Sequence, residues 1–182
     1  MFRSWYIFVV LEQKTRWIIH TCVTQSPTDA WMAQQLRQAT PWGQGPKYLI
    51  HDRDSKYATH FSAVAARSGI KELRTPDHVP QANGICERFM GSLRRECLDQ
   101  TLIYEGRHLE RVVKEYTAYF NQGRPHHGIG QRIRDQYELP KSKSTSGCIT
   151  SKVILGGLHH SYSRTPHLNQ PMLFLQKTYE QG

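Results

Sequence analysis

Two acidic side chains, Asp52 and Asp54, stand directly after a short apolar run in the stretch YLIHDRDSKY, and Glu87 follows 35 positions after Asp52. Carboxylates that converge repel one another unless a proton or a metal ion lies between them. Hard oxygen ligands with few histidines suit Mg²⁺ or Mn²⁺. Two such ions, roughly 3.5–4 Å apart, can bind the attacking and leaving oxygens of a phosphodiester. The residues alone leave an alternative open, because a carboxylate after a strand is often only a turn or helix-cap residue.

The composition favours a polyanionic partner. The chain has 182 residues, a formal net charge of +9 and a pI near 9.6, and an excess of positive charge of this kind is typical of nucleic-acid-binding proteins. The alternative is a basic globular protein without such a partner. No apolar run approaches the roughly 18–20 residues that span a bilayer, so we predict no membrane partner and a cytoplasmic location.

The four cysteines have no CxxC spacing, and the two His-His doublets have no further ligands at metal-binding spacing. Neither a zinc ribbon nor a structural zinc site is therefore expected. In a cytoplasmic chain the cysteines are expected to be free thiols.

Hydrophobic patterning predicts a mixed α/β domain. The expected strands cover 5–11, 16–24, 47–51 and 70–74. The expected helices run from Ser26 (N-cap) and Pro27 (first turn) to about Thr40, then over 58–68 with Gly69 as the stop, 83–98 and 106–122. Asp52 then lies at the carboxyl end of a strand, where open α/β sheets place their sites. Glu87 lies near the start of a long helix that can pack across the sheet edge.

The character of the chain changes after residue 123. We expect a core over 1–135, followed over 136–182 by a linker and a small extension. The linker is predicted at 141–147 (KSKSTSG). Residues 152–158 and 171–176 are predicted to pair as a small hairpin.

Three stretches, HDRDSKY, TPDHVPQANGICERFMGSLRRECLD and YFNQGRPHHGIGQ, together resemble the integrase catalytic core of bacterial insertion-sequence transposases over roughly residues 5–135. The late stretch LGGLHHSY also resembles the tail of some of these transposases. The resemblance implies a ribonuclease-H-like mixed sheet flanked by helices, with an Asp-Asp-Glu metal triad. Matched by position, Asp52 is the family's second catalytic Asp and Glu87 its catalytic Glu, so both are implied ligands of Mg²⁺ or Mn²⁺.

The resemblance also implies DNA as a partner and suggests which residues bind it. Asn83 lies on the matching loop and is expected to position DNA or Glu87. Arg88, Arg94 and Arg95 extend along the same helix, the last two about two turns beyond Glu87. They are candidates for phosphate contacts, with a solvated basic face as the alternative. Asp54 stands where many members carry Gly, which favours a role within the loop.

The chain departs from the family pattern at its first catalytic Asp. The strand at 5–11 resembles the family's second strand, so the first, central strand and its Asp are expected upstream of Met1. Neither Glu12, at the end of the strand at 5–11, nor Asp29, on the first helix, is expected to replace that Asp. The two remaining carboxylates are expected to bind metal weakly or not at all. The 182-residue chain is therefore expected not to join DNA strands.

Three functional hypotheses remain. The first is DNA integration or transposition, with the chain as a truncated transposase core whose intact form performs metal-dependent cleavage and strand transfer. The second is an inactive nucleic-acid-binding fragment that associates with itself, or with intact transposase as an inhibitor. The third is a ribonuclease-H-type nuclease outside transposition, against which the GRPHH and LGGLHHSY stretches argue. For Arg124, Pro125 and His126 a structural role is favoured over DNA contact.

Overall fold

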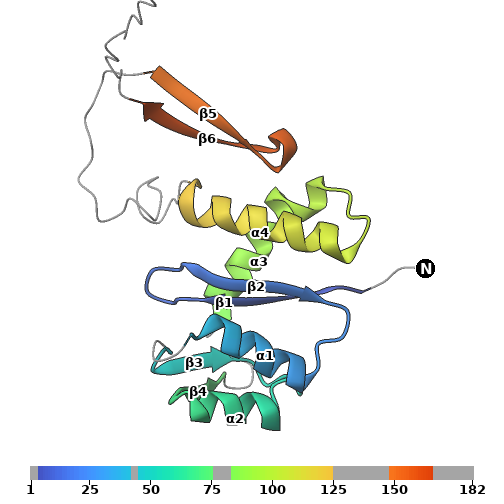
Figure 1. Cartoon of the computed structure of the whole chain (residues 1–182), viewed down its shortest axis with the longest axis vertical. Helices are drawn as coiled ribbons and strands as arrows, with labels where there is room; N and C mark the ends of the chain where they lie inside the picture. The colour runs from blue at the N-terminus through green and yellow to red at the C-terminus, as the bar shows by residue number, and fades with distance from the viewer. Residues whose placement is uncertain (1–3, 42–44, 76–82, 125–147, 166–182) are drawn as a thin grey trace, which may run out of the picture.

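The computed structural model describes residues 4–41, 45–75, 83–124 and 148–165 (Figure 1). The strands are β1 (Tyr6–Leu11), β2 (Ile18–Thr24), β3 (Tyr48–His51), β4 (Lys71–Arg74), β5 (Cys148–Ile154) and β6 (His159–Thr165). The helices are α1 (Asp29–Ala39), α2 (Thr59–Arg67), α3 (Gly84–Glu96) and α4 (Gly106–Gln122). This order confirms the predicted α/β class.

The strands pair in three two-stranded sheets. Strands β1 and β2 are antiparallel, β3 and β4 are parallel, and β5 and β6 form an antiparallel hairpin. Among the described residues no strand pairs with both β1 and β3. The parallel β3–β4 pair and the antiparallel β1–β2 pair give the mixed strand directions that were predicted.

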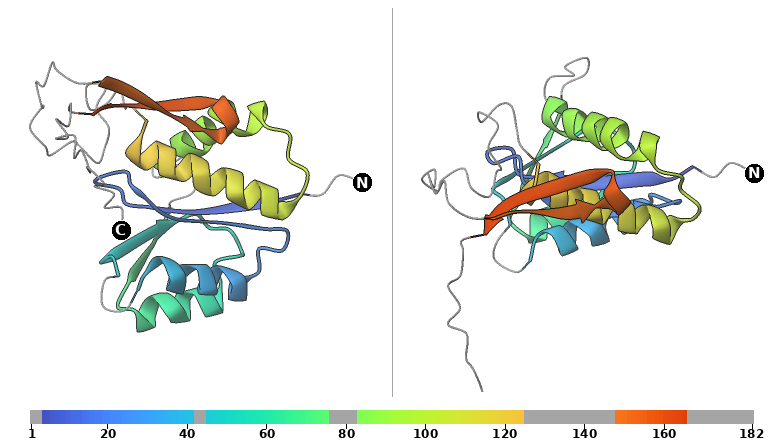
Figure 2. Two further views of the ribbon diagram at one scale, coloured as in Figure 1. Left: turned by 45° about the horizontal axis from the view of Figure 1, so that its top comes forward. Right: turned by 90° about the horizontal axis from the view of Figure 1, so that it is seen from above.

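Strand β1 is a continuous apolar run because both of its faces are covered. Ile7, Val9 and Leu11 pack against the cluster formed with α3 and α4. Phe8 and Val10 alternate with them and pack against the cluster formed with α1 and α2. Figures 1 and 2 show the β1–β2 pair between these two groups of helices.

The predicted start of the first helix was wrong. The structure begins α1 at Asp29, and the N-cap is Thr28, whose hydroxyl accepts a hydrogen bond from the Trp31 amide at 3.3 Å. The helix over 106–122 was predicted with its observed bounds. The helix expected over 83–98 ends at Glu96 and continues into a short 3-10 turn, Leu98–Gln100. Gly69 ends the 58–68 region as predicted, with a φ of +70° that favours glycine.

The hairpin after the core was predicted with the wrong partner strand. Strand β5 pairs with β6, which follows at once through the turn Leu155–Gly157. Gly156 and Gly157 allow this tight turn, because both have a positive φ. The predicted linker at 141–147, residues 171–176 and the domain boundary at 135/136 lie outside the described residues. Over the described ranges, no helix combines the length and apolar character needed to cross a bilayer.

Candidate active site

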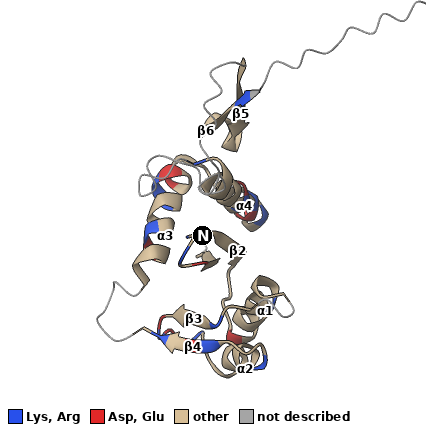
Figure 3. Cartoon of the chain, turned by 90° about the vertical axis from the view of Figure 1, so that its left-hand side faces the viewer, with Lys and Arg blue, Asp and Glu red and all other residues tan. Residues whose placement is uncertain are grey.

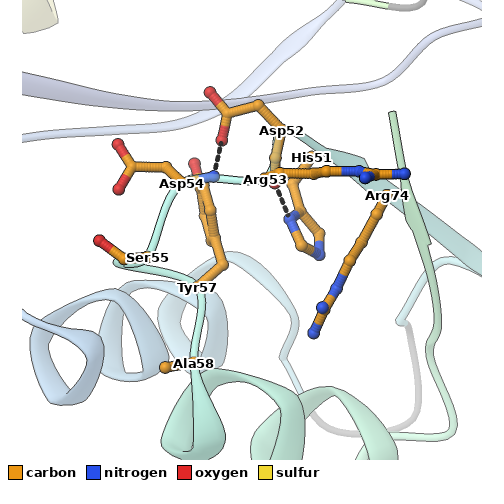
Figure 4. A pocket seen from close by; sticks show the side chains of 8 residues that line it. All are labelled: His51, Asp52, Arg53, Asp54, Ser55, Tyr57, Ala58 and Arg74. Atoms are coloured by element: carbon orange, nitrogen blue, oxygen red, sulfur yellow. Dashed lines mark hydrogen bonds between the residues drawn. The ribbon is translucent and has the colours of Figure 1, made fainter. Parts of the chain in front are cut away.

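Asp52 lies where the sequence places it, immediately beyond the end of β3. Its carboxylate is exposed, and its Oδ1 accepts a hydrogen bond from the Asp54 amide at 3.3 Å. This is an Asx-type turn, which holds the side chain against the following loop. A pocket of about 560 Å³ opens here, lined by His51, Asp52, Arg53, Asp54, Ser55, Tyr57, Ala58 and Arg74 (Figure 4).

Asp54 takes part in the loop, as expected. Its carboxylate accepts hydrogen bonds from Lys56 Nζ at 2.5 Å and from the Lys56 amide at 3.0 Å. These bonds from Lys56 lower the pKa of Asp54 below its usual value. Asp54 is thus an ionised group already paired with a cation, whereas the Asp52 side chain accepts from an amide.

Glu87 lies on the exposed side of the first turn of α3. The residue before it, Cys86, is affected by the charges of both Glu87 and Asp52. Burial raises the pKa of the Cys86 thiol, and the charges of Glu87 and Asp52 raise it further. The pKa of the Tyr57 hydroxyl is raised by burial and then by the charge of Asp52. The charge of Asp52, which follows β3, and the charge of Glu87, on α3, therefore both raise the pKa of the same thiol.

Asp52 and Glu87 carry carboxylate oxygens, which are the ligands that suit a hard divalent cation. Across the described ranges, however, no group of three or more His, Cys, Asp or Glu side chains is arranged to hold a metal ion.

The predicted DNA-binding residues all lie on α3 or at its start. Asn83 is the half-buried N-cap, and its side chain makes no capping hydrogen bond. Arg88 Nε donates to the Gly84 carbonyl at 3.1 Å, and Arg94 Nε lies 3.5 Å from Asp99 Oδ1. The Arg95 guanidinium lies over Gly91, where an added Cβ would come within 3.1 Å of its Nη1.

Figure 3 shows basic residues along α3. At about 1.5 Å of rise per residue, Arg94 lies roughly 10 Å along the axis from Glu87. This spacing separates Glu87 and Arg94 by about three nucleotides of one strand, at roughly 3.4 Å each. The two arginines thus lie at the far end of α3 from Glu87.

Arg124 has the structural environment that was favoured for it. Its guanidinium donates from Nε to Glu96 Oε2 at 2.8 Å and from Nη2 to Glu96 Oε1 at 2.6 Å. The Tyr116 hydroxyl donates to the same carboxylate at 2.8 Å. Burial alone would raise the pKa of Glu96, but the bonds from Arg124 and Tyr116 outweigh it and lower that pKa. Pro125 and His126 lie outside the described residues.

Sequence reasoning missed the side chains that surround Asp52. His51 is buried, with Glu72 of β4 and Ser62 of α2 behind it. The sequence gives a weak indication of a role for His51, because this residue directly precedes Asp52 at the end of the strand. Glu72 and Ser62 have none, because only the pairing of β3 with β4 and the packing of α2 bring them to this position.

Comparisons with known proteins show what this chain is similar to in sequence and fold. A family model described as an integrase core domain matches residues 68–133, which include Glu87. A 39.2 kDa protein of the insertion element IS476 from Xanthomonas euvesicatoria is 24% identical over 123 residues, covering 67% of this chain and 36% of that protein. The chain thus spans little more than a third of the length of this relative.

The fold is shared with a retroviral assembly. The cryo-EM structure of the simian T-cell lymphotropic virus intasome, in complex with PP2A regulatory subunit B56 gamma, matches with a TM-score of 0.59. The identity is 16%, and the match covers 89% of this chain and 61% of that chain. The chain is thus similar to an integrase core domain over residues 68–133, to a protein of a bacterial insertion element over 123 residues, and in fold to a chain of a retroviral intasome.

Proposed function

We propose that this chain is part of an enzyme of DNA integration or transposition, in which Asp52 and Glu87 bind Mg²⁺ or Mn²⁺. The observation that carries the proposal is that Asp52 directly follows the end of β3 beside a pocket and Glu87 lies in the first turn of α3, with the half-buried Cys86 near enough to both that their charges raise the pKa of its thiol. A bound divalent cation would activate water and stabilise charge on a phosphodiester. DNA as the substrate implies the bacterial cytoplasm.

The chain's own residues would bind and orient the DNA strand. Arg94 and Arg95 would contact phosphates about three nucleotides from the carboxylates, and Arg88 and Asn83 would contact the strand near Glu87. In the intact enzyme these contacts would align a phosphodiester at the element's end for attack by water. They would then align the freed 3′-hydroxyl for attack on target DNA.

Metal binding by the 182-residue chain tests the role of the carboxylates. We expect weak Mn²⁺ binding, seen as loss of the free-ion signal in electron paramagnetic resonance. Asp52→Asn and Glu87→Gln should each abolish it. Asp54→Asn is the matched control and should retain it, because Asp54 is paired with Lys56. Equal Mn²⁺ binding by the wild type and by both site variants would reject the assignment.

A second candidate function is supported by the absence of a third metal ligand from the described residues. The chain would then bind DNA, or associate with itself or with intact transposase, without catalysing strand transfer. Mixing it with an intact relative and measuring strand transfer tests this role. Inhibition supports it, whereas Mg²⁺-dependent strand transfer by the 182-residue chain alone would reject it.

A further inference from the structure

The ring of His51 lies between the peptide that follows it and the neighbouring strand. Its Nδ1 lies 2.7 Å from the Asp52 carbonyl oxygen, and its Nε2 lies 3.0 Å from Glu72 Oε2. The residue is only 6% exposed. Figure 4 shows the bond from the ring to the main chain beside Asp52.

The chemistry of the two partners fixes how the ring is used. A carbonyl oxygen can only accept, so Nδ1 carries a hydrogen and donates it to the Asp52 carbonyl. Nε2 lies 3.0 Å from Glu72 Oε2, so the second ring nitrogen is also in hydrogen-bonding contact. Both ring nitrogens are therefore engaged, and the ring cannot turn without breaking a buried hydrogen bond.

The surroundings hold this arrangement from two further sides. The His51 ring centroid lies 4.6 Å from that of Tyr57 and 5.5 Å from that of Phe61. Ser62 Oγ donates to Glu72 Oε2 at 3.2 Å, which holds the carboxylate that faces the ring. The His51 carbonyl accepts from the Thr75 amide at 2.9 Å, so its main chain is also held by the residue after β4.

We propose that His51, held by Glu72, is a positioning residue that sets the direction of the Asp52 carboxylate. The bond from Nδ1 fixes the Asp52–Arg53 peptide plane at the point where β3 ends. That plane sets where the Asp54 amide lies, and this amide donates to Asp52 Oδ1 at 3.3 Å. The inference deepens the proposed function, because it rests on Asp52 being a metal ligand.

Two substitutions of His51 by similar side chains test the two hydrogen bonds of the ring independently. In His51→Asn the side-chain amide reaches the position of Nδ1, so it can still donate to the Asp52 carbonyl. In His51→Gln it reaches the position of Nε2 and retains only the contact with Glu72. A merely structural role would be impaired similarly in both variants, whereas a positioning role predicts that only His51→Gln disturbs Asp52.

The first readout needs no metal: the side-chain rotamer of Asp52, from three-bond couplings in nuclear magnetic resonance of the whole chain. We expect one dominant χ1 rotamer in the wild type and in His51→Asn, and averaged rotamers in His51→Gln. Glu72→Ala keeps the Nδ1 donor but removes the group that stops the long His51 ring from turning, so we expect averaging smaller than in His51→Gln; the shorter side chain in His51→Asn reaches the Asp52 carbonyl without a second partner. Glu72→Ala therefore serves if the His51 variants fail to fold. An unchanged Asp52 rotamer in Glu72→Ala and in every folded His51 variant would overturn the inference.

The matched control is a second strand histidine, His20, whose Nε2 lies 2.9 Å from Gln35 Oε1. His20→Asn and His20→Gln should leave the Asp52 couplings unchanged. If they also average the rotamer, the effect is general loosening and the inference is wrong.

The second readout is Mn²⁺ affinity, which distinguishes this inference from the proposed function. Loss of groups that orient a metal ligand typically weakens metal binding about 10- to 100-fold. We expect a loss in that range for His51→Gln and a smaller loss for His51→Asn. If the wild type binds no Mn²⁺ through Asp52, the proposed metal role fails for this chain, and the rotamer measurement still decides the role of His51.

Discussion

The side chain of Asn121, near the end of α4, pairs with the backbone of Ile18 at the start of β2. Its Oδ1 accepts from the Ile18 amide at 3.0 Å, and its Nδ2 donates to the Ile18 carbonyl at 2.9 Å. Both residues are buried. The amide group thus satisfies the backbone of β2 as a neighbouring strand would, and it attaches the last core helix to the sheet.

Replacement of Asn121 by Ala should be strongly destabilising, because it leaves the buried Ile18 amide and carbonyl without their side-chain partner. At roughly 1–3 kcal/mol for each of these two unsatisfied buried groups, we expect the free energy of unfolding to fall by about 2–6 kcal/mol. Urea denaturation followed by circular dichroism measures this. Gln122→Ala, at the exposed neighbouring position, is the control and should change stability by less than about 0.5 kcal/mol. Equal stability of the two variants would contradict the role of Asn121.

Asp29 makes the stability of the chain depend on acid pH. Its carboxylate accepts from the amides of Ala58, His60 and Phe61, so it caps α2 from the start of α1. Burial alone would raise the pKa of Asp29, but these hydrogen bonds outweigh it and lower that pKa from 3.8 to about 2.

Because the folded-state pKa is depressed, the contribution of Asp29 is fully present well above pH 3.8 and is lost as the pH falls towards 2. The advantage of the wild type over Asp29→Asn in free energy of unfolding should therefore shrink across this window. Urea titrations at several pH values measure it. Asp99→Asn is the control, since the Asp99 carboxylate contacts Arg94 only at an exposed site. A pH-independent difference between wild type and Asp29→Asn would exclude the mechanism.

The Glu96–Arg124 pair should stabilise the junction between the helices and the β5–β6 hairpin. His159 of β6 stacks on Tyr119, with ring centroids 4.7 Å apart, and its Nε2 lies 2.8 Å from the Glu96 carbonyl. Arg124→Lys keeps the charge but loses the two-point contact with Glu96.

We expect Arg124→Lys to destabilise the chain by about 1–2 kcal/mol. Amide exchange in β6 should also be faster. Thermal denaturation and hydrogen exchange measure the two effects. The control is Lys114→Arg, at the exposed Lys114–Glu110 pair on α4, which should leave both unchanged. Unaltered exchange in β6 for Arg124→Lys would show that the pair does not support the hairpin.

If Arg94 and Arg95 contact DNA phosphates, replacing either by Gln should weaken binding similarly for every DNA sequence. The slope of log affinity against log salt should fall by about 1 for each residue removed. Fluorescence anisotropy with labelled duplexes at several salt concentrations measures this. Arg67→Gln, in the last turn of α2, is a charge-matched control. An identical loss of affinity and slope in the control would indicate general charge attraction instead of a binding face on α3.

Much of the fold was predictable from local patterns. The apolar stripe of α4 gave its bounds, since helical periodicity is local, and the continuous apolar run of β1 indicated a strand with both faces covered. The start of α1 was mispredicted because Ser26-Pro27 and Thr28-Asp29 both offer plausible caps. The two caps differ in a long-range contact, because the Asp29 carboxylate accepts a hydrogen bond from the amide of Ala58, 29 positions later in the chain.

The α/β class, the resemblance to integrase cores and the candidate carboxylates Asp52 and Glu87 could all be predicted from the sequence. Each of them depends on residue types within short stretches of the chain. Only the tertiary structure decided which side chains surround the carboxylates. His51 and Glu72 are 21 positions apart, and parallel pairing of β3 with β4 brings them together. Asn121 reaches Ile18 across 103 positions, because α4 packs on the sheet. Such contacts follow from how the elements pack, which no local pattern of residues encodes.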